Sequence, residues 1–259
     1  MSGFLFHETV FGPVMSRRLG VSLGINLLPV DYKYCTFNCV YCECGWTHSK
    51  PEGSNGLPSR DEVKVLLEEK LKTMLADNQV PDAITFAGNG EPTIHPDFPG
   101  LIDDTIALRD RFFPDAKITV LSNASMLHRD DVFSALKATD KNIQKLDAGN
   151  EGLFRLINQP AGSLSLGKVV EQLCLFEGKL IVQTLFLRGE HKGESIDNTT
   201  EQDVEAWIML LQKIKPEYVM IYSIDRATPE QGIEKVSFDE LSAIAKKVNM
   251  TGIKTKVFG

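Results

Sequence analysis

Four of the chain's five cysteines lie within ten positions of one another and carry its clearest chemistry. Cys35, Cys39 and Cys42 stand in the segment Cys-Thr-Phe-Asn-Cys-Val-Tyr-Cys, and Cys44 follows. Thiols this close in a reducing compartment indicate metal binding rather than disulfides. Three thiolates can hold three irons of a cubane cluster and leave the fourth iron open to a small ligand, which suits catalysis. Cys174 lies in an apolar segment and is expected to be a buried small hydrophobe.

A second interpretation of these thiols is a structural zinc site made by Cys35, Cys39, Cys42 and Cys44. Structural zinc also favours four cysteines, but it typically takes them from two separated pairs. In the iron–sulfur interpretation Cys44 is a spare thiol near the cluster. A zinc or iron–sulfur module that serves only for binding would need no further motif elsewhere in the chain.

The composition describes a protein with a substantial core. The chain has 259 residues, of which 42% are hydrophobic and 24% charged, the balance of a soluble globular protein. Residues 1–11 lack the pattern of a secretory signal, and no stretch approaches the roughly 18 apolar residues of a membrane helix. We therefore expect a cytoplasmic protein without membrane contact. A net charge of −7 argues against a broad nucleic-acid surface, although a local basic patch stays open.

The elements that must position the cysteines alternate regularly along the chain. Apolar runs predict strands, and capped amphipathic segments, such as the one that begins at the capping box Ser59–Glu62, predict helices. Such repeated strand–helix units imply an α/β fold with a parallel sheet, either a partial barrel or an open doubly wound sheet, in one domain over 1–259. The strands are expected at 22–28, 82–87, 117–121, 143–148, 180–187, 218–222 and 253–257. The helices are expected at 59–75, 98–113, 130–138, 151–157, 166–176, 200–214 and 237–248.

Polar residues follow several of these strands, at the edge where parallel sheets bind ligands. Glycines in the turn 86–93, after the second strand, would let a backbone approach a ligand closely. Ser122 and Asn123 close the third strand. Lys145 and Asp147 are two apart in the fourth and should share one face, as ligand groups or as a surface ion pair. Gln183 interrupts an apolar strand and either faces a ligand or is a satisfied structural amide.

The spacing CxxxCxxC, with an aromatic residue before the last cysteine, resembles the signature of the radical S-adenosylmethionine (SAM) superfamily. This resemblance implies a partial parallel (β/α)6 barrel of radical SAM type and a [4Fe–4S] cluster bound by the loop 35–42. The cluster ligands would be Cys35, Cys39 and Cys42. The amino and carboxylate groups of SAM would then chelate the open iron, and Tyr41 would lie beside the adenine.

The resemblance also implies roles for the polar residues. The turn Gly88-Asn89-Gly90-Glu91 looks like the superfamily's GGE-type motif, which receives the SAM amino group, with Asn89 in place of a glycine. One of Lys145 and Asp147 would bind the methionine carboxylate, and the other would bind the ribose hydroxyls. The remaining residues expected at the cofactor are Ser122, Asn123 and Gln183.

Segments at 11–20, 145–149, 154–160 and 224–229 are similar to one branch of the superfamily, the Fe–S oxidoreductases related to wyosine biosynthesis. Enzymes of wyosine synthesis modify a tRNA guanine and are expected to carry further cysteines upstream of the main loop. Residues 1–34 contain no cysteine, and the chain is acidic. A nucleic-acid substrate is therefore not favoured.

The resemblance implies reductive cleavage of SAM to a 5′-deoxyadenosyl radical that abstracts hydrogen from an unidentified substrate. A flavodoxin or ferredoxin would supply the electron. The alternative is a macromolecule-modifying enzyme that acts on a tRNA base or activates a glycyl-radical protein. A non-catalytic metal module ranks third.

A reactive radical needs a lid, and the loops 43–58 and 188–199 are the candidates. Expected substrate contacts are Arg188, His191, Tyr222 and Arg226. Arg17 and Arg18, before the first strand, could grip a phosphate or carboxylate or simply form a solvated edge.

Overall fold

One curved, mostly parallel sheet organises the computed structural model, which describes residues 3–48 and 51–259. Its strand order is β1-β2-β3-β4-β5-β6-β8-β10, with β7 and β9 paired to β6 outside this path. Neighbours from β2 to β10 are parallel, and β1 is antiparallel to β2 at one edge. The strands are β1 Val10–Ser16, β2 Gly20–Ile25, β3 Ala83–Phe86, β4 Lys117–Ser122, β5 Lys141–Lys145, β6 Ile181–His191, β7 Glu194–Asp197, β8 Tyr218–Ser223, β9 Glu234–Lys235 and β10 Thr255–Phe258.

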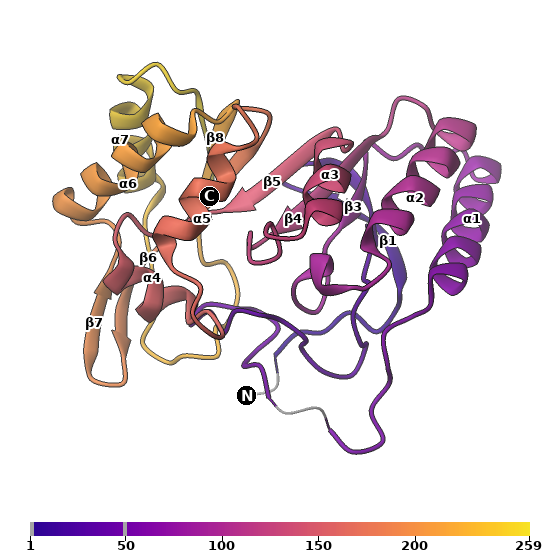
Figure 1. Ribbon diagram of the computed structural model, residues 1–259, viewed down its shortest axis with the longest axis horizontal. Helices are drawn as coiled ribbons and strands as arrows, with labels where there is room; N and C mark the ends of the chain where they lie inside the picture. Colours follow the sequence, from indigo (N-terminus) through magenta and orange to yellow (C-terminus); the bar gives the residue numbers. More distant parts are fainter. Residues whose placement is uncertain (1–2, 49–50) are drawn as a thin grey trace.

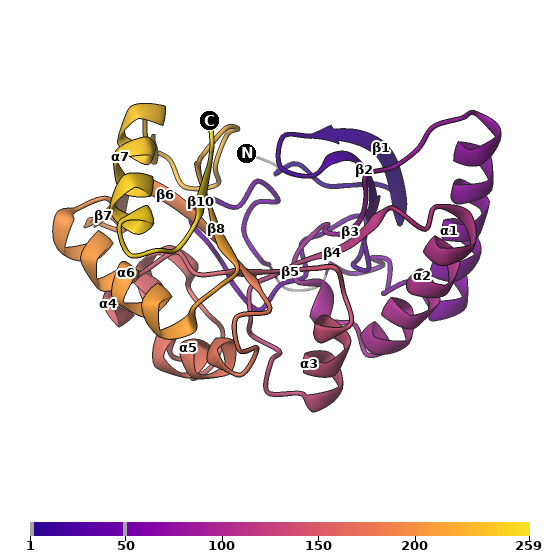
Figure 2. The ribbon, with the colours of Figure 1, turned by 90° about the horizontal axis from the view of Figure 1, so that it is seen from above.

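The helices form an outer arc around this sheet, as the views in Figure 1 and Figure 2 show. The strands lie inside the arc, so the sheet is bent like an incomplete barrel (Figure 2). The expected α/β fold with a partial parallel barrel is confirmed. The helices are α1 Arg60–Ala76, the 3-10 turn η1 Pro92–Ile94, α2 Phe98–Phe112, α3 Asp130–Lys137, α4 Glu151–Asn158, α5 Leu166–Cys174, α6 Glu201–Ile214 and α7 Phe238–Asn249.

Local sequence explains most of these elements. All four residues of β3 are buried, as expected for a strand of a parallel sheet covered on both faces. Helix α1 begins after Ser59, whose hydroxyl accepts a hydrogen bond from the Glu62 amide. The predicted capping box of Ser237 and Glu240 is present at the start of α7. These elements bring the loops that follow β2, β3, β4 and β5 to the same edge of the sheet.

The edge strand β1 was not among the expected strands. Gly12 and Pro13 interrupt its alternating pattern, and the pairing with β2 shifts register between Phe11 and Val14. Proline donates no hydrogen bond to a ladder and is tolerated mainly at sheet edges, where β1 lies. Pro13 therefore accounts both for the irregular pattern of the β1 sequence and for the position of β1 at the edge of the sheet.

The segment 188–199, expected to be a polar loop, is instead a β-hairpin. Strand β6 continues to His191 and pairs antiparallel with β7. Lys192 and Gly193 connect the two strands with φ angles of 53° and 80°. Positive φ at both central residues is what a two-residue hairpin turn of the favoured hand requires. The other expected lid, 43–58, contains residues 49–50 and so lies partly outside the described residues.

Within the part of the chain that the structure describes, none of the helices combines the length and the apolar character needed to cross a membrane.

Candidate functional site

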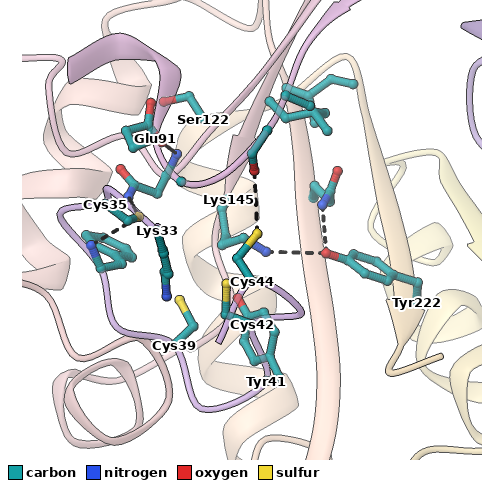
Figure 3. A pocket seen from close by; sticks show the side chains of 18 residues that line it. Lys33, Cys35, Cys39, Tyr41, Cys42, Cys44, Glu91, Ser122, Lys145 and Tyr222 are labelled. Atoms are coloured by element: carbon teal, nitrogen blue, oxygen red, sulfur yellow. Dashed lines mark hydrogen bonds between the residues drawn. The ribbon is translucent and has the colours of Figure 1, made fainter. Parts of the chain in front are cut away.

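Most of the residues expected at the site surround one cavity of about 220 Å³ inside the barrel (Figure 3). We call this cavity the cysteine pocket. The loop after β2 supplies the cysteines, and residues in or just after β3, β4, β5, β6 and β8 supply the other walls. The expected residues that line it are Cys35, Cys39, Tyr41, Cys42, Gly88, Gly90, Glu91, Ser122, Asn123, Lys145, Gln183 and Tyr222.

The cysteine loop is tied to the end of α4. The Asn38 and Val40 amides donate to the carbonyls of Asn158 and Ile157, each at 3.0 Å. The Asn158 side-chain amide donates to the Cys39 sulfur at 3.4 Å, and the Cys39 thiol donates to the Asn158 carbonyl at 3.7 Å. A segment more than a hundred residues away in sequence therefore fixes the position of the middle cysteine.

The four loop thiols differ in acidity. Burial raises the pKa of Cys35 and of Cys39. A hydrogen bond from Cys44 lowers the pKa of Cys42 to about 5 against the effect of burial, and the Lys33 ammonium adds to this. The same hydrogen bond raises the pKa of Cys44, whose thiol also lies 3.6 Å from the Gly88 carbonyl oxygen. The pocket thus favours a thiolate at Cys42 and a proton on Cys44.

No three His, Cys, Asp or Glu side chains among residues 3–48 and 51–259 are grouped closely enough to hold a single metal ion. The choice of Cys35, Cys39 and Cys42 as cluster ligands stays a prediction. Cys174 is half-buried on α5 and donates to the Lys213 carbonyl, far in sequence from the loop.

The glycine turn packs directly against the cysteine loop. The Tyr34 amide donates to the Asn89 carbonyl at 2.8 Å, and the Glu91 amide donates to the Tyr34 carbonyl at 3.2 Å. Gly90 has a φ of 145°, and a Cβ there would lie 1.9 Å from the Tyr34 carbonyl oxygen. Only glycine fits such an approach without displacing the backbone.

The Asn89 side chain does not reach the pocket. It is fully buried beneath the turn, and its amide nitrogen donates to the carbonyls of Phe6 and Pro29, each at 2.8 Å. Asn89 therefore anchors the N-terminal segment, and this explains how an asparagine stands where the motif has a glycine.

Glu91 joins the turn to the next strand end. Its buried carboxylate accepts hydrogen bonds from the Asn123 amide at 2.6 Å and the Thr93 amide at 3.2 Å. Burial raises the pKa of Glu91. The Asn123 side chain in turn donates to the Cys35 sulfur at 3.6 Å and to the Thr36 hydroxyl at 3.0 Å.

Asp147 is separated from the cysteine pocket, contrary to the shared strand face expected for it and Lys145. Strand β5 ends at Lys145, and the Asp147 side chain is fully enclosed behind the pocket wall. Its carboxylate accepts hydrogen bonds from Tyr41, from Asn158 at 2.7 Å and from the Leu185 amide at 2.9 Å. These contacts make Asp147 the centre of a buried network.

Lys145 reaches the pocket with its ammonium group. The nitrogen lies 3.7 Å from the Asp147 carboxylate and donates to the Tyr222 hydroxyl at 3.3 Å. Burial alone would lower the pKa of Lys145, but the negative charge of Asp147, together with smaller contributions from Tyr222 and Cys39, outweighs it, so the pKa is raised. Lys145 therefore keeps its positive charge inside the barrel.

Lys33 is a pocket residue that the sequence did not reveal. Its ammonium is buried and donates to the Gly45 carbonyl at 3.0 Å. Burial would lower the pKa of Lys33, but the negative charge of the cysteine loop, above all that of Cys42, outweighs this and raises it. Its position two residues before Cys35 was the available signal, but a lysine in a polar stretch is ordinarily solvated.

Two of the expected substrate contacts lie elsewhere. Arg188 donates to Glu240 of α7 at 2.7 Å, and it does not line the cysteine pocket. His191 is buried against Trp46 and pairs with Glu230, also outside that pocket. The hairpin that begins with β6 directs these side chains away from the cavity.

Arg226 lines an adjoining cavity rather than the cysteine pocket, and it pairs with Glu43 at 2.6 Å. Tyr222 lines both cavities. Its hydroxyl accepts a hydrogen bond from the Gln183 side-chain nitrogen at 2.7 Å, whereas the side-chain oxygen of Gln183, Oε1, is buried and has no partner among the described residues.

Comparison with known proteins agrees with this geometry. A family model described as "Radical SAM superfamily" matches residues 30–151. The chain is 31% identical over 252 residues to "UPF0026 protein MJ1312" of Methanocaldococcus jannaschii, and the match covers 95% of this chain and 73% of that protein. The chain belongs to the UPF0026 family within the radical SAM superfamily.

Another curated relative is longer than this chain. A protein of Brachyspira hyodysenteriae named "GTPase Obg" is 32% identical over 243 residues, which is 92% of this chain but 33% of that protein. The UPF0026 chain thus spans about a third of that relative.

Solved structures share the radical SAM fold at low identity. A radical SAM methyltransferase from Sphaerobacter thermophilus matches with a TM-score of 0.68 and 14% identity, over 92% of this chain and 65% of that one. SuiB of Streptococcus suis bound to S-adenosylmethionine matches with a TM-score of 0.64 and 14% identity, over 91% and 50%. An archaeal TYW1 matches with a TM-score of 0.54 and 13% identity, over 88% and 71%.

Membership of the radical SAM superfamily implies an enzyme. The superfamily uses a [4Fe–4S] cluster together with SAM, and it includes structures that contain SAM. The similarity to TYW1 shows the fold alone, so the wyosine-related branch has little support beyond the motifs.

Proposed function

We propose that this UPF0026 protein is a radical SAM enzyme whose cysteine pocket holds both cofactors. Cys35, Cys39 and Cys42 would bind a [4Fe–4S] cluster, and the turn 88–91 with Lys145 would bind SAM. One observation carries the proposal: the cysteine loop, the glycine turn and Lys145 line a single cavity. The reaction would remove a hydrogen atom from a substrate that is not identified.

The side chains of the pocket fit these cofactors chemically. The donor set is three thiols from one short loop, which matches three irons of a cubane and leaves the fourth iron for SAM. The ammonium groups of Lys33 and Lys145 offset the negative charge of thiolates in a buried site. The unpartnered side-chain oxygen of Gln183, Oε1, is an acceptor that a bound ligand can satisfy.

Each part of the chain then has a defined task. Lys145 carries the charge suited to the methionine carboxylate, and Tyr222 and Asp147 hold its ammonium in place. Gly90 lets the turn approach the cysteine loop closely. Tyr41, fixed by Asp147, presents its ring to the pocket beside Cys42, where it can pack against the adenine. When bound and reduced, the cluster supplies the electron that cleaves SAM to methionine and a 5′-deoxyadenosyl radical.

A flavodoxin or ferredoxin in the cytoplasm would fit as the electron donor, because the free thiols of the pocket need a reducing compartment.

The test uses anaerobically purified and reconstituted protein. We expect about four irons per chain and release of 5′-deoxyadenosine from SAM after reduction with dithionite. Cys39→Ala should lose both iron and product, because it removes one of the three proposed cluster ligands. Cys174→Ala is the matched control and should keep both. Stoichiometric zinc without cleavage of SAM would contradict the proposal and favour a metal-stabilised binding domain.

A further inference from the structure

A second cavity of about 220 Å³ adjoins the cysteine pocket, and we call it the arginine pocket. The turn between β1 and β2 supplies Arg17 and Arg18, and the segment after β8 supplies Arg226. Tyr41, Cys42 and Tyr222 line both cavities, so the two share a wall.

Two of the three arginines already have anionic partners. Arg17 lies 3.1 Å from Asp225, and Arg226 lies 2.6 Å from Glu43. Both pairs are about half exposed, so each contributes little to stability. The charges of these two arginines are balanced within the cavity wall.

Arg18 differs from the other two. Its guanidinium lies over the Tyr222 ring, with the central carbon 4.6 Å from the ring centroid. The Nη1 atom is buried and has no hydrogen-bond partner among the described residues, and no described carboxylate forms an ion pair with Arg18. A buried donor without an acceptor costs free energy that a bound anion would recover.

We propose that Arg18 binds the anionic group, a carboxylate or a phosphate, of the enzyme's small-molecule substrate. The planar fork of a guanidinium matches either group with two parallel hydrogen bonds. The lining charges of the arginine pocket are three arginines against Glu43 and Asp225, in a protein whose net charge is −7. The pocket is therefore a local exception to the charge of the whole chain.

Tyr222 connects this anchor to the cysteine pocket. Its ring supports Arg18, while its hydroxyl contacts Lys145 and Gln183. A substrate held by its anionic end at Arg18 would extend along the shared wall of Tyr41, Cys42 and Tyr222. This orientation rests on the proposed function, because it places the uncharged part of the substrate beside the SAM site.

The test is equilibrium dialysis of the reconstituted protein at low ionic strength, with radiolabelled inorganic phosphate in one arm and radiolabelled acetate in the other. We expect wild-type protein to bind at least one of the two anions. The anion that binds more tightly shows whether the substrate group at Arg18 is a phosphate or a carboxylate. Arg18→Gln and Arg18→Met should each weaken that binding about tenfold or more, as expected for a charge-assisted contact. Methionine keeps the unbranched apolar stem of the side chain and removes only the guanidinium group, so it serves if the glutamine variant unfolds.

The control is Arg111→Gln, because Arg111 is exposed on α2 and pairs with Glu68. This variant should bind like the wild type. Binding of neither anion by wild-type protein, or equal binding by a folded Arg18 variant, would overturn the inference. Iron content and 5′-deoxyadenosine release of the wild type, measured on the same preparation, judge the proposed function separately.

Discussion

The cysteine pocket and the arginine pocket have the same volume, about 220 Å³, and share a wall, but they are built differently. The first comes from two contiguous motifs, the cysteine loop and the glycine turn. The second is lined from five separate segments, at 17–18, 41–43, 185, 222–226 and 258. A site that needs several ligands from one short loop leaves a signature in the sequence, whereas a site made of scattered residues does not.

The charged groups of the two pockets also differ in their surroundings. Lys145 and Asp147 form a buried pair, with side chains 19% and 0% exposed. Arg17 and Asp225 are 54% and 45% exposed. Removing one member of a buried pair costs far more than removing one member of an exposed pair. The cysteine pocket should therefore respond strongly to single substitutions that other charged regions of the protein tolerate.

The largest effect is expected from Asp147→Asn, which keeps the shape of the side chain and removes its charge. The substitution leaves the Lys145 ammonium without a counter-charge and turns an amide donor towards the donor groups of Tyr41 or Asn158. We expect a loss of about 3 kcal/mol in the free energy of unfolding, measured by urea denaturation of the protein without cofactors.

The same variant tests the role first expected for Asp147. If Asp147 binds the ribose of SAM, the stability of the cofactor-free protein should stay unchanged, and only the affinity for SAM should fall. Asp115→Asn is the matched control, because Asp115 is exposed and its substitution should change neither quantity.

A smaller loss is expected from Gly90→Ala. The new Cβ would meet the Tyr34 carbonyl oxygen at 1.9 Å, on a backbone with a φ of 145°. We expect a loss of about 2 kcal/mol in stability and a lower iron content, because Tyr34 precedes the first cysteine. Gly56→Ala, whose Cβ would enter open space, should change neither the stability nor the iron content. Unchanged iron content in Gly90→Ala would show that the turn and the loop adapt independently.

The smallest effect is expected from Arg188→Ala at the base of the hairpin. The hydrogen bond from Arg188, with further hydrogen bonds from the Ser237 hydroxyl and amide, lowers the pKa of Glu240 to about 2 from its ordinary 4.5. A lowered carboxyl pKa stabilises the fold above pH 4.5, and this contribution is lost as the pH falls towards 2. Because the pair is exposed, we expect a fall of only about one or two degrees in melting temperature at pH 7.

The difference between Arg188→Ala and wild type should shrink when melting is measured at pH 3 instead of pH 5. A fall of many degrees in melting temperature at pH 7 would contradict the comparison between buried and exposed ion pairs. It would mean that the exposed pair of Arg188 and Glu240 stabilises the fold as strongly as a buried pair does.

The sequence predicted the fold because the signals for it are local. The N-cap serine of α1, the capping box of α7 and the buried run of β6 lie at or inside the elements that they specify. At α1 only the Ser59 half of the expected capping box forms. The hairpin after β6 was missed because its turn, Lys192-Gly193, lacks the usual asparagine or aspartate.

The candidate site was predictable only in part, because only some of its features depend on residues close together in the sequence. The spacing of Cys35, Cys39 and Cys42 within eight residues requires no tertiary information. By contrast, Asp147 is withdrawn from the pocket by Tyr41 and Leu185, and its two-residue spacing from Lys145 could not show this.

The sequence by itself indicated the radical SAM superfamily and predicted the alternation of strands and helices, because spacing and periodicity act over short stretches of chain. Only the tertiary structure decided that Lys33 is buried beside the thiols and that Arg18 stacks on Tyr222 with a free donor. The environment of a single side chain depends on neighbours from remote segments, and the barrel brings these together when its two edges approach each other.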